Sequence, residues 1–488
     1  MDIPKEQIEE FKKLIESDES IKSDIEKLLN YLPYCEYELI IYMIEKKVWK
    51  GNRPKPPKDF KKGSGSIELG LFLYWLKNPK EIDLSSFTLG EALAILAVIA
   101  ALNYMLADSK IDETNYDFFK NGDELIYLDG SVLSIEKYAT YDQGWFIAFI
   151  NLVETTSRFL WYNNGKFPTT PPPRIKIEGK QKNTVSIALL GDWGAGNLAA
   201  KEVMARISVL KPDYIMHLGD VYYSGTPSKG KHYFSLGEEY KNLLDLWPKG
   251  YVGKSFTLNS NHEMYSGANG LFIDALKSAG TPFVAQYGAS CFALDFDGYT
   301  LLGLDTAYMG KVKDAFMIGS IGKPSGFQSQ WIKNLKLDPK KTIVFSHHNG
   351  FADDCTSVSP LWSEIREVLG DDPFAWYWGH VHNGIVYDMP MHIPDKNGEG
   401  NGFSTTTYAR CLGHAALPYG DGESLQDKPI TWRAQNKRTD KPKELYNGFA
   451  MLTLKSNGGA VNSILEQFYD TSSKAQPVYQ KHLGKNES

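Results

Sequence analysis

Between residues 184 and 382, short apolar runs alternate with amphipathic stretches of helical period. The apolar runs are VSIALL, YIMHL, KSFTL, TIVFSH and FAWYWGH, and helical stretches such as NLAAKEVMARISVL and LWSEIREVL lie between them. Strands that alternate with helices predict an α/β domain with a largely parallel sheet. In such a sheet the crevice beyond the carboxyl ends of the strands binds ligands, so we expect the residues that follow the runs to converge there.

The residues at the ends of these runs carry carboxylate, amide and imidazole groups. They are Asp192, Asp220, Asn261, His262, His347, His348, His380 and His382. This mixture of donors suits borderline divalent metals and iron, and the set is larger than one ion requires. The sequence therefore predicts two metal ions. Gly191, Gly219 and Gly379 each precede a donor, where a residue without a side chain allows a sharp turn from strand to loop.

The pattern before this region is different. Residues 1 to about 165 show the apolar spacing of helices, and none of the ten histidines precedes His217. The segment NNGKFPTTPPPR at 163–174 has four prolines and marks a boundary. We expect a helical N-terminal domain over residues 1–170, an α/β domain over residues 180–470 and a C-terminal tail over residues 471–488.

Composition excludes several classes of protein. The chain is 42% hydrophobic and 23% charged, as in ordinary globular proteins, and its net charge of −6 gives no strong signal for nucleic-acid binding. The four cysteines, Cys35, Cys291, Cys355 and Cys411, show no CxxC spacing. Because neither a zinc ribbon nor a disulfide framework has this pattern, we expect free thiols.

The first residues and the longest apolar stretch bear on localisation. The opening MDIPKEQIEEFKKLIESDES has no apolar core and no cleavage site, so it is not a Sec signal. The default expectation is the cytoplasm, although export without such a signal would leave no mark of this kind. The apolar stretch at 92–107 is shorter than the ~18 to 20 residues of a membrane span, which favours a buried helix.

Five motif blocks resemble, in order, those of the calcineurin-like metallophosphoesterases. They are GDWG at 191–194, GDVYYSG at 219–225, SNHE at 260–263, FSHH at 345–348 and GHVH at 379–382. The resemblance implies a β-sandwich flanked by helices over about 184–383, extended to about 470 by closing strands. It does not cover the N-terminal domain, which could cap the cleft, mediate oligomerisation or bind an unknown protein partner.

The resemblance also implies a ligand set. Most members of the family have a histidine two positions after the first aspartate, where this chain has Gly194. Tyr223 follows Asp220 by three positions, as the iron-binding tyrosine does in the purple acid phosphatase branch, whereas Tyr222 is expected in the core or the cleft wall. The implied sites are Asp192, Asp220, Tyr223 and His382 for Fe(III), and Asp220, Asn261, His347 and His380 for Fe, Zn or Mn, with Asp220 bridging.

Further roles follow from the same resemblance. His262 is the implied general acid, and Glu263 is a possible partner that orients it. The candidates for substrate binding are Asn261, His348, Arg410 and His414, the last two in the segment TTYARCLGHAALPYG at 406–420. Ser260 stands where the family has glycine, which restricts the backbone of this turn.

The expected activity is hydrolysis of a small phosphorylated substrate, a phosphomonoester, by a metal-bound hydroxide. The same metal frame also serves phosphodiesterases and nucleases, and a domain without activity that only binds is a further alternative. The sequence does not choose among substrates.

Overall fold

The computed structural model describes residues 161–228, 239–312, 315–394, 402–417, 425–437, 444–472 and 476–484, residue 420, residues 53–61, and scattered residues between 33 and 155. The chain divides into two compact units, residues 1–154 with 231–236, and residues 155–230 with 237–488. All five motif blocks of the sequence lie in the second unit.

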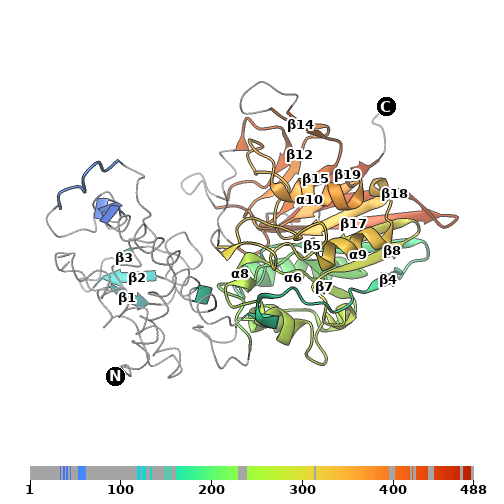
Figure 1. The fold of residues 1–488 in the computed structure, drawn as a ribbon, viewed down its shortest axis with the longest axis horizontal. Helices are drawn as coiled ribbons and strands as arrows, with labels where there is room; N and C mark the ends of the chain where they lie inside the picture. The colour runs from blue at the N-terminus through green and yellow to red at the C-terminus, as the bar shows by residue number, and fades with distance from the viewer. Residues whose placement is uncertain are drawn as a thin grey trace. The chain divides into compact units, whose positions relative to one another are not determined.

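Two large β-sheets form the second unit (Figure 1). The six-stranded sheet has the order β19-β18-β17-β5-β6-β7, and the eight-stranded sheet has the order β16-β12-β15-β11-β10-β9-β8-β4. In the smaller sheet, β5 (Thr184–Leu190), β6 (Tyr214–His217) and β7 (Ser255–Thr257) are parallel. In the larger sheet, β9 (Tyr299–Gly303), β10 (Thr342–Ser346), β11 (Ala375–Trp378) and β15 (Tyr408–Leu412) are parallel. The strands that precede the predicted metal donors all belong to these two parallel groups.

The other strands complete the edges of the larger sheet. They are β4 (Arg174–Lys176), β8 (Phe292–Phe296), β12 (Gly384–Tyr387) and β16 (Ile430–Arg433). β8, β12 and β16 pair antiparallel with their neighbours β9, β15 and β12. A separate ribbon joins β13 (Met391–Ile393) to β14 (Phe403–Thr405).

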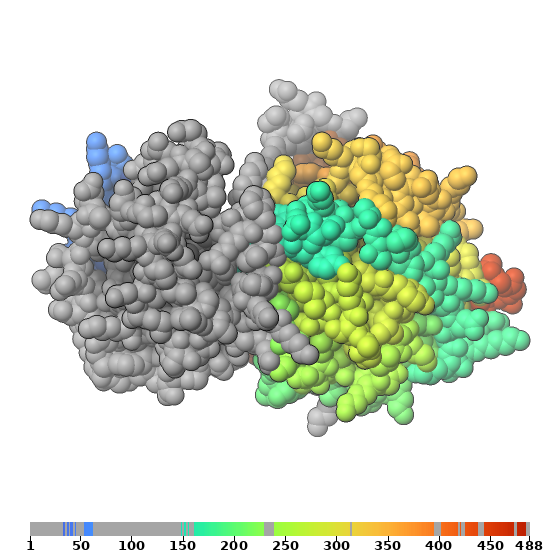
Figure 2. Space-filling view, turned by 60° about the horizontal axis from the view of Figure 1, so that its bottom comes forward, coloured from blue at the N-terminus to red at the C-terminus, as the bar shows by residue number. Residues whose placement is uncertain are grey.

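The two sheets pack face to face around one apolar core. Ile187 and Leu452 of the smaller sheet and Phe345 of the larger one belong to this core. Because side chains alternate along a strand, Val344 and Trp376 point to the opposite face, where they pack in a second cluster with α9 (Phe327–Leu335) and α10 (Pro360–Leu369). The predicted α/β sandwich flanked by helices is therefore confirmed. In the space-filling view, described segments of this unit from between about 160 and 370 lie side by side on one face (Figure 2).

Strands from the end of the chain lie beside β5, near the middle of the smaller sheet. β17 (Gly448–Asn457) pairs antiparallel with both β5 and β18 (Ala460–Asp470). β19 (Tyr479–Leu483) then pairs with β18. Residues 479–483 are thus part of the sheet and not of the expected tail, because their backbone hydrogen bonds complete its edge. Residues 485–488 lie outside the described residues.

Most of the predicted N-terminal helical domain lies outside the described residues, including the opening segment and residues 92–107. Where this part is described, it is not only helical, because β1 (Phe118–Asn121), β2 (Glu124–Tyr127) and β3 (Val132–Leu133) form a small antiparallel sheet. Among the helices that the structure describes, none has both the length and the apolar character needed to cross a membrane. Cys291, Cys355 and Cys411 are buried free thiols, and Cys35 lies outside the described residues.

Candidate metal centre

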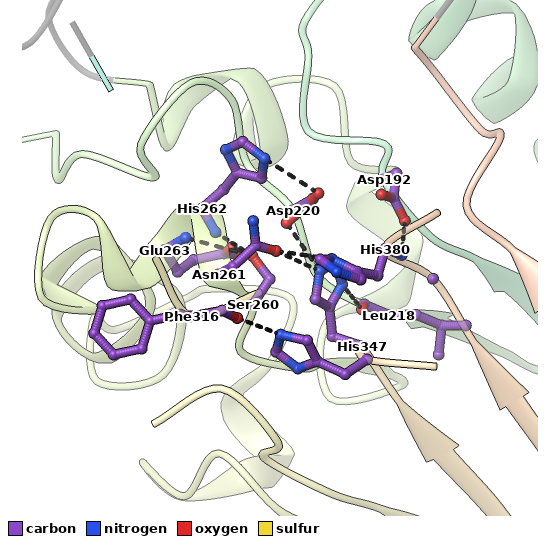
Figure 3. A network of polar contacts seen from close by, with 12 residues as sticks. Asp192, Leu218, Asp220, Ser260, Asn261, His262, Glu263, Phe316, His347 and His380 are labelled. Atoms are coloured by element: carbon purple, nitrogen blue, oxygen red, sulfur yellow. Dashed lines mark hydrogen bonds and ion pairs between the residues drawn. The ribbon is translucent and has the colours of Figure 1, made fainter. Parts of the chain in front are cut away.

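The predicted donors come together at the carboxyl ends of five strands. Asp192 follows β5, Asp220 follows β6, and Asn261 begins the short helix α8 (Asn261–Met264) after β7. His347 follows β10, and His380 and His382 follow β11. Figure 3 shows that Asn261 points toward the imidazoles of His347 and His380 and that Asp220 lies beside them.

Unusual backbone conformations turn three of these donors into the crevice. Asp192, Asp220 and His380 have positive φ angles of 58°, 78° and 71°. Left-handed backbone is rare for residues with side chains and is found preferentially at functional sites. Of the three preceding glycines, only Gly219 itself has a positive φ, 97°. Position 379 requires glycine for a different reason. A Cβ there would lie 2.5 Å from Oδ2 of Asp192, which is too close.

One group of donors consists of Asp192, Asp220 and His382, whose ligand atoms lie within 4.8 Å of one another. Nε2 of His382 lies 3.5 Å from Oδ1 of Asp192. Both carboxylates are buried, and the ion pairs described for them are with histidines. Two buried carboxylates so close together favour a bound cation, which would neutralise their repulsion.

The phenol that joins this group is that of Tyr222. Its hydroxyl donates to Oδ2 of Asp220 at 2.7 Å, and lies 3.2 Å from Oδ1 of Asp192 and 3.3 Å from Nε2 of His382. Tyr222 is fully buried, as expected for a residue of the core or the cleft wall, and its hydroxyl also meets the donor group. Tyr223, the predicted phenolic ligand, meets this site through its backbone carbonyl, which accepts a hydrogen bond from His262.

Contacts of Gly194 explain why the first tyrosine reaches the carboxylates. The amide of Gly194 donates to the carbonyl of Asp220 at 2.9 Å, and the carbonyl of Gly194 accepts from the amide of Tyr222 at 3.0 Å. A Cβ at Gly194 would lie 2.7 Å from the backbone of Asp220 and of Val221. A histidine at this position would not fit, and the close approach fixes the course of the chain that carries Tyr222.

A second group is centred on Asn261. Its Oδ1 lies 2.8 Å from Nε2 of His347 and 3.1 Å from Nδ1 of His380. The other ring nitrogen of His347 donates to the carbonyl of Leu218 at 2.9 Å, which leaves a lone pair on Nε2. Nε2 also faces Oδ1 of Asp220 at 3.2 Å. Atoms with lone pairs thus point at one another, an arrangement that a cation between them would satisfy.

The pKa shifts of three buried histidines and of Asp220 favour the forms that bind metals. Burial lowers the pKa of His347 to about 3 and the pKa of His380 and of His382 to about 4, so these rings are neutral near pH 7. Burial, and then the charge of Asp220, raises the pKa of Asp192 well above its usual value. Burial alone would also raise the pKa of Asp220, but His262 and His347 together hold it below its usual value. Neutral imidazoles and an ionised carboxylate are the forms that ligate metals.

His262 lies at the edge of the site in a defined orientation. Its Nδ1 donates to the carbonyl of Tyr223 at 2.7 Å, and its Nε2 lies 3.8 Å from Oδ2 of Asp220. Ser260 supports this position as the N-cap of α8, because its hydroxyl accepts from the amides of His262 and Glu263. Ser260 has extended backbone, with φ −139°, so the expected restriction of the turn by this residue has no cost here.

Glu263 has contacts other than the predicted one with His262. Its carboxyl group meets the hydroxyl of Ser260 and accepts from the hydroxyl of Tyr240 at 3.5 Å. Burial, and then the charge of Asp220, raises the pKa of Glu263 to about 8. The group that orients His262 is the carbonyl of Tyr223, while Glu263 holds the start of α8.

His348 lies close to His347 and His380, but both of its ring nitrogens have protein partners. Nδ1 lies 2.9 Å from the hydroxyl of Thr306, and Nε2 donates to the carbonyl of Phe316 at 2.7 Å. These contacts fix the segment around Phe316, and His348 also has a ring nitrogen within 4.8 Å of ring nitrogens of His347 and His380. The contact of His348 with substrate stays a prediction.

Arg410 is not placed to bind substrate. Its guanidinium is 1% exposed and forms a bidentate pair with Glu466, with Nη2 at 2.6 Å from Oε1. Burial alone would lower the pKa of Arg410, but the carboxylate of Glu466 raises it above its usual value. The charge is therefore satisfied in the core, where β15 faces β18, and the predicted substrate contact is wrong.

His414 is also buried, at 1% exposure. Its ring packs against the backbone of Gly384 and Gly448, and its two ring nitrogens have no protein partner among the described residues. Burial lowers the pKa of His414 to about 3. The structure therefore gives this predicted substrate residue a place in the core.

One residue of the site region escaped sequence reasoning. The buried carboxylate of Glu239 accepts from the amides of Tyr223, Ser224 and Thr226 at 2.9, 2.9 and 3.1 Å. It therefore holds the loop that follows Asp220. No motif marks Glu239, because its partners are backbone groups that any sequence would offer.

Comparison with known proteins agrees with this geometry. Residues 185–384 match the family model of the calcineurin-like phosphoesterases, a range that includes all five motif blocks. The match covers less than half of the chain and identifies residues 185–384 as similar to a calcineurin-like phosphoesterase domain. No curated protein matches the chain.

Several solved structures are similar to the chain. GAP50, the anchor in the inner membrane complex of Plasmodium, has a TM-score of 0.43 and 15% identity over 63% of this chain and 90% of its own. A hypothetical protein from Thermus thermophilus has a TM-score of 0.28 and 13% identity over 58% of this chain and 99% of its own. A Staphylococcus aureus protein provisionally assigned as a 5'-nucleotidase has a TM-score of 0.27 and 12% identity over 59% of this chain and 54% of its own.

Proposed function

We propose that the domain containing residues 185–384 is a dinuclear metallophosphoesterase that hydrolyses phosphomonoesters, similar to the purple acid phosphatase branch. The observation that carries this proposal is the juxtaposition of two donor groups that share Asp220. On one side Asp220 meets Tyr222, and on the other it faces His347. Both donor groups are largely buried and place atoms with lone pairs opposite one another, as a pair of cations requires.

The two ions would share Asp220 and would differ in their other ligands. Asp192, Asp220, Tyr222 and His382 would hold one ion, and Asp220, Asn261, His347 and His380 would hold the other. When bound, two such ions supply the charge that activates water and neutralises the phosphate oxygens. His262 supplies the other requirement, a proton donor for the departing alcohol. Its Nδ1–H is committed to the carbonyl of Tyr223, so Nε2 is the atom that gives a proton to the departing alcohol oxygen as the P–O ester bond breaks.

Hydrolysis is tested by metal analysis together with rates on a phosphomonoester, a phosphodiester and pyrophosphate. Asp220→Asn should lower both the metal content and the rate, because it weakens a ligand shared by both ions. Asp371→Asn is a matched control, because Asp371 pairs with Lys340 at the surface. A wild-type protein that binds two ions and hydrolyses only diesters would support a phosphodiesterase, and one that hydrolyses no ester would support a binding module.

The phenol of Tyr222 indicates which metal the Asp192 site would hold. Carboxylates and a phenolate are hard anionic ligands that suit Fe(III), so we propose iron in the Asp192 site and iron, zinc or manganese in the Asn261 site. A phenolate bound to Fe(III) absorbs visible light. After loading with iron under oxidising conditions, the wild type and Tyr223→Phe should be coloured, and Tyr222→Phe should lose the band. A band that survives in Tyr222→Phe and disappears in Tyr223→Phe would return the ligand role to Tyr223.

A further inference from the structure

An apolar surface lies beside the candidate proton donor. The ring of Tyr265 is 4.9 Å from the ring of His262, centroid to centroid, and the side chain of Tyr265 is half-buried. Sδ of Met317 lies 3.8 Å from the hydroxyl of Tyr265 and 3.6 Å from Nδ2 of Asn261. Met317 is nevertheless 49% exposed. A large apolar side chain thus borders the metal donors with half of its surface open to solvent.

The segment that carries Met317 is fixed to the site by its backbone. The carbonyl of Phe316 accepts from Nε2 of His348 at 2.7 Å, and the ring of His380 hydrogen bonds to the backbone of Met317. The ring of Phe316 is buried and packs edge-on against Trp161 at 5.3 Å. These contacts give His348 a structural role beside the metal donors, and they hold Met317 in place before any substrate arrives.

Tyr265 offers mainly its ring to a ligand. Its hydroxyl accepts a hydrogen bond from Nδ2 of Asn261 at 3.0 Å, which directs the oxygen toward the metal donors. The remaining surface is an aromatic face beside a thioether. Thioethers and aromatic rings pack favourably with one another, and methionine adapts its shape to irregular apolar groups.

We propose that Tyr265 and Met317 form the subsite for the departing alcohol and select phosphomonoesters of aromatic or other apolar alcohols. This inference rests on the proposed function, because it requires His262 to protonate the alcohol oxygen. An alcohol whose oxygen lies at Nε2 of His262 has its carbon skeleton next to the ring of Tyr265, and from there it reaches Met317.

The test compares kcat/KM for 2-naphthyl phosphate and glycerol phosphate in the wild type and in variants. For each substrate, kcat/KM of a variant is divided by kcat/KM of the wild type. The different chemical reactivities of the two esters then do not affect the comparison. Met317→Ser should lower the preference for the naphthyl ester by roughly 5- to 20-fold, as expected for the loss of an aromatic–thioether contact and of apolar burial. Met317→Leu, which stays apolar, should keep most of the preference.

Met389→Ser is the matched control, since Met389 is 37% exposed and follows β12 at the end of this strand opposite His382. It should leave the preference unchanged, and metal content should be equal in all variants. Suppose that the wild type hydrolyses both esters. If Met317→Ser then lowers the two rates by the same factor, or lowers neither rate, the subsite inference is wrong and the proposed function stands. If the wild type hydrolyses neither ester, the proposed function itself fails.

Discussion

Replacing Arg410 by methionine should destabilise the phosphoesterase domain without a specific effect on substrate binding. Arg410 lies on β15 of the eight-stranded sheet and Glu466 on β18 of the six-stranded sheet, so their ion pair crosses the sandwich. Nε of Arg410 is 2.9 Å from both carboxylate oxygens, and Tyr377 donates to Oε2 at 2.9 Å. Without the guanidinium, Glu466 keeps one hydroxyl as its described partner in a site with 0% exposure.

The magnitude follows from this burial. Removing one partner of a buried ion pair costs about 3–5 kcal/mol, because the other charge is left without compensation. That loss shifts the folding equilibrium roughly a hundred- to several-thousand-fold. In the double variant Arg410→Met with Glu466→Gln, no charge remains and the amide oxygen still accepts from Tyr377. The double variant should therefore recover much of the lost stability.

The assay is denaturant unfolding followed by circular dichroism, with kcat and KM measured where each variant is folded. The midpoint should fall in Arg410→Met at an unchanged slope and rise again in the double variant. A variant with wild-type stability and a strongly raised KM would refute this reasoning and would restore Arg410 as a substrate ligand.

Three further predictions concern supporting residues. Glu239→Gln should lower metal affinity and stability, because an amide nitrogen replaces one acceptor of the loop amides, and charge-assisted bonds of this kind contribute about 1.5–3 kcal/mol each; calorimetric titration with metal measures the affinity. Ser260→Ala should cost about 0.5–2 kcal/mol through loss of the N-cap, and Ser260→Gly only a few tenths, as measured by denaturant midpoints. His414 is neutral in the folded state with a pKa of about 3, so the unfolded chain binds more protons as pH falls from about 6.5, and stability should fall by up to about 1.4 kcal/mol per pH unit. Unfolding midpoints for His414→Leu should depend less steeply on pH, and an equal slope would contradict the neutral state of this ring.

Much of the site could be read from the sequence because it depends on where strands end. A short apolar run followed by Gly-Asp or by His places a donor at the edge of a parallel sheet, whatever the rest of the chain does. The structure accordingly brings Asp192, Asp220, Asn261, His347 and His380 together. The left-handed backbone of Asp192, Asp220 and His380 is a property of the same strand-to-loop turns.

Features that depend on contacts between distant segments could not be read in this way. Tyr222 and Tyr223 are neighbours of the same type, and the contact of Gly194 with Asp220 and Val221 decides which hydroxyl meets the carboxylates. From the sequence, Arg410 resembles a phosphate ligand. Its partner Glu466 lies 56 positions later and on the other sheet, so the sequence does not reveal the ion pair. The sequence did not predict β19. A short strand at a sheet edge is held by hydrogen bonds to the backbone of its neighbour, and apolar and polar residues do not clearly alternate along β19.

The donors of the metal centre belong to both sheets, and this division makes the centre a cross-link between the layers. Asp192 and Asp220 follow strands of the six-stranded sheet, and His347 and His380 follow strands of the eight-stranded sheet. An ion held by both pairs would resist sliding of one layer over the other, and its binding free energy would add to that of folding. The cross-link also depends on residues far from any motif. A chain that stops before β17 would contain every donor but would lack the strand that pairs with β5. Its ligands would be present, but the sheet that holds them together would be incomplete.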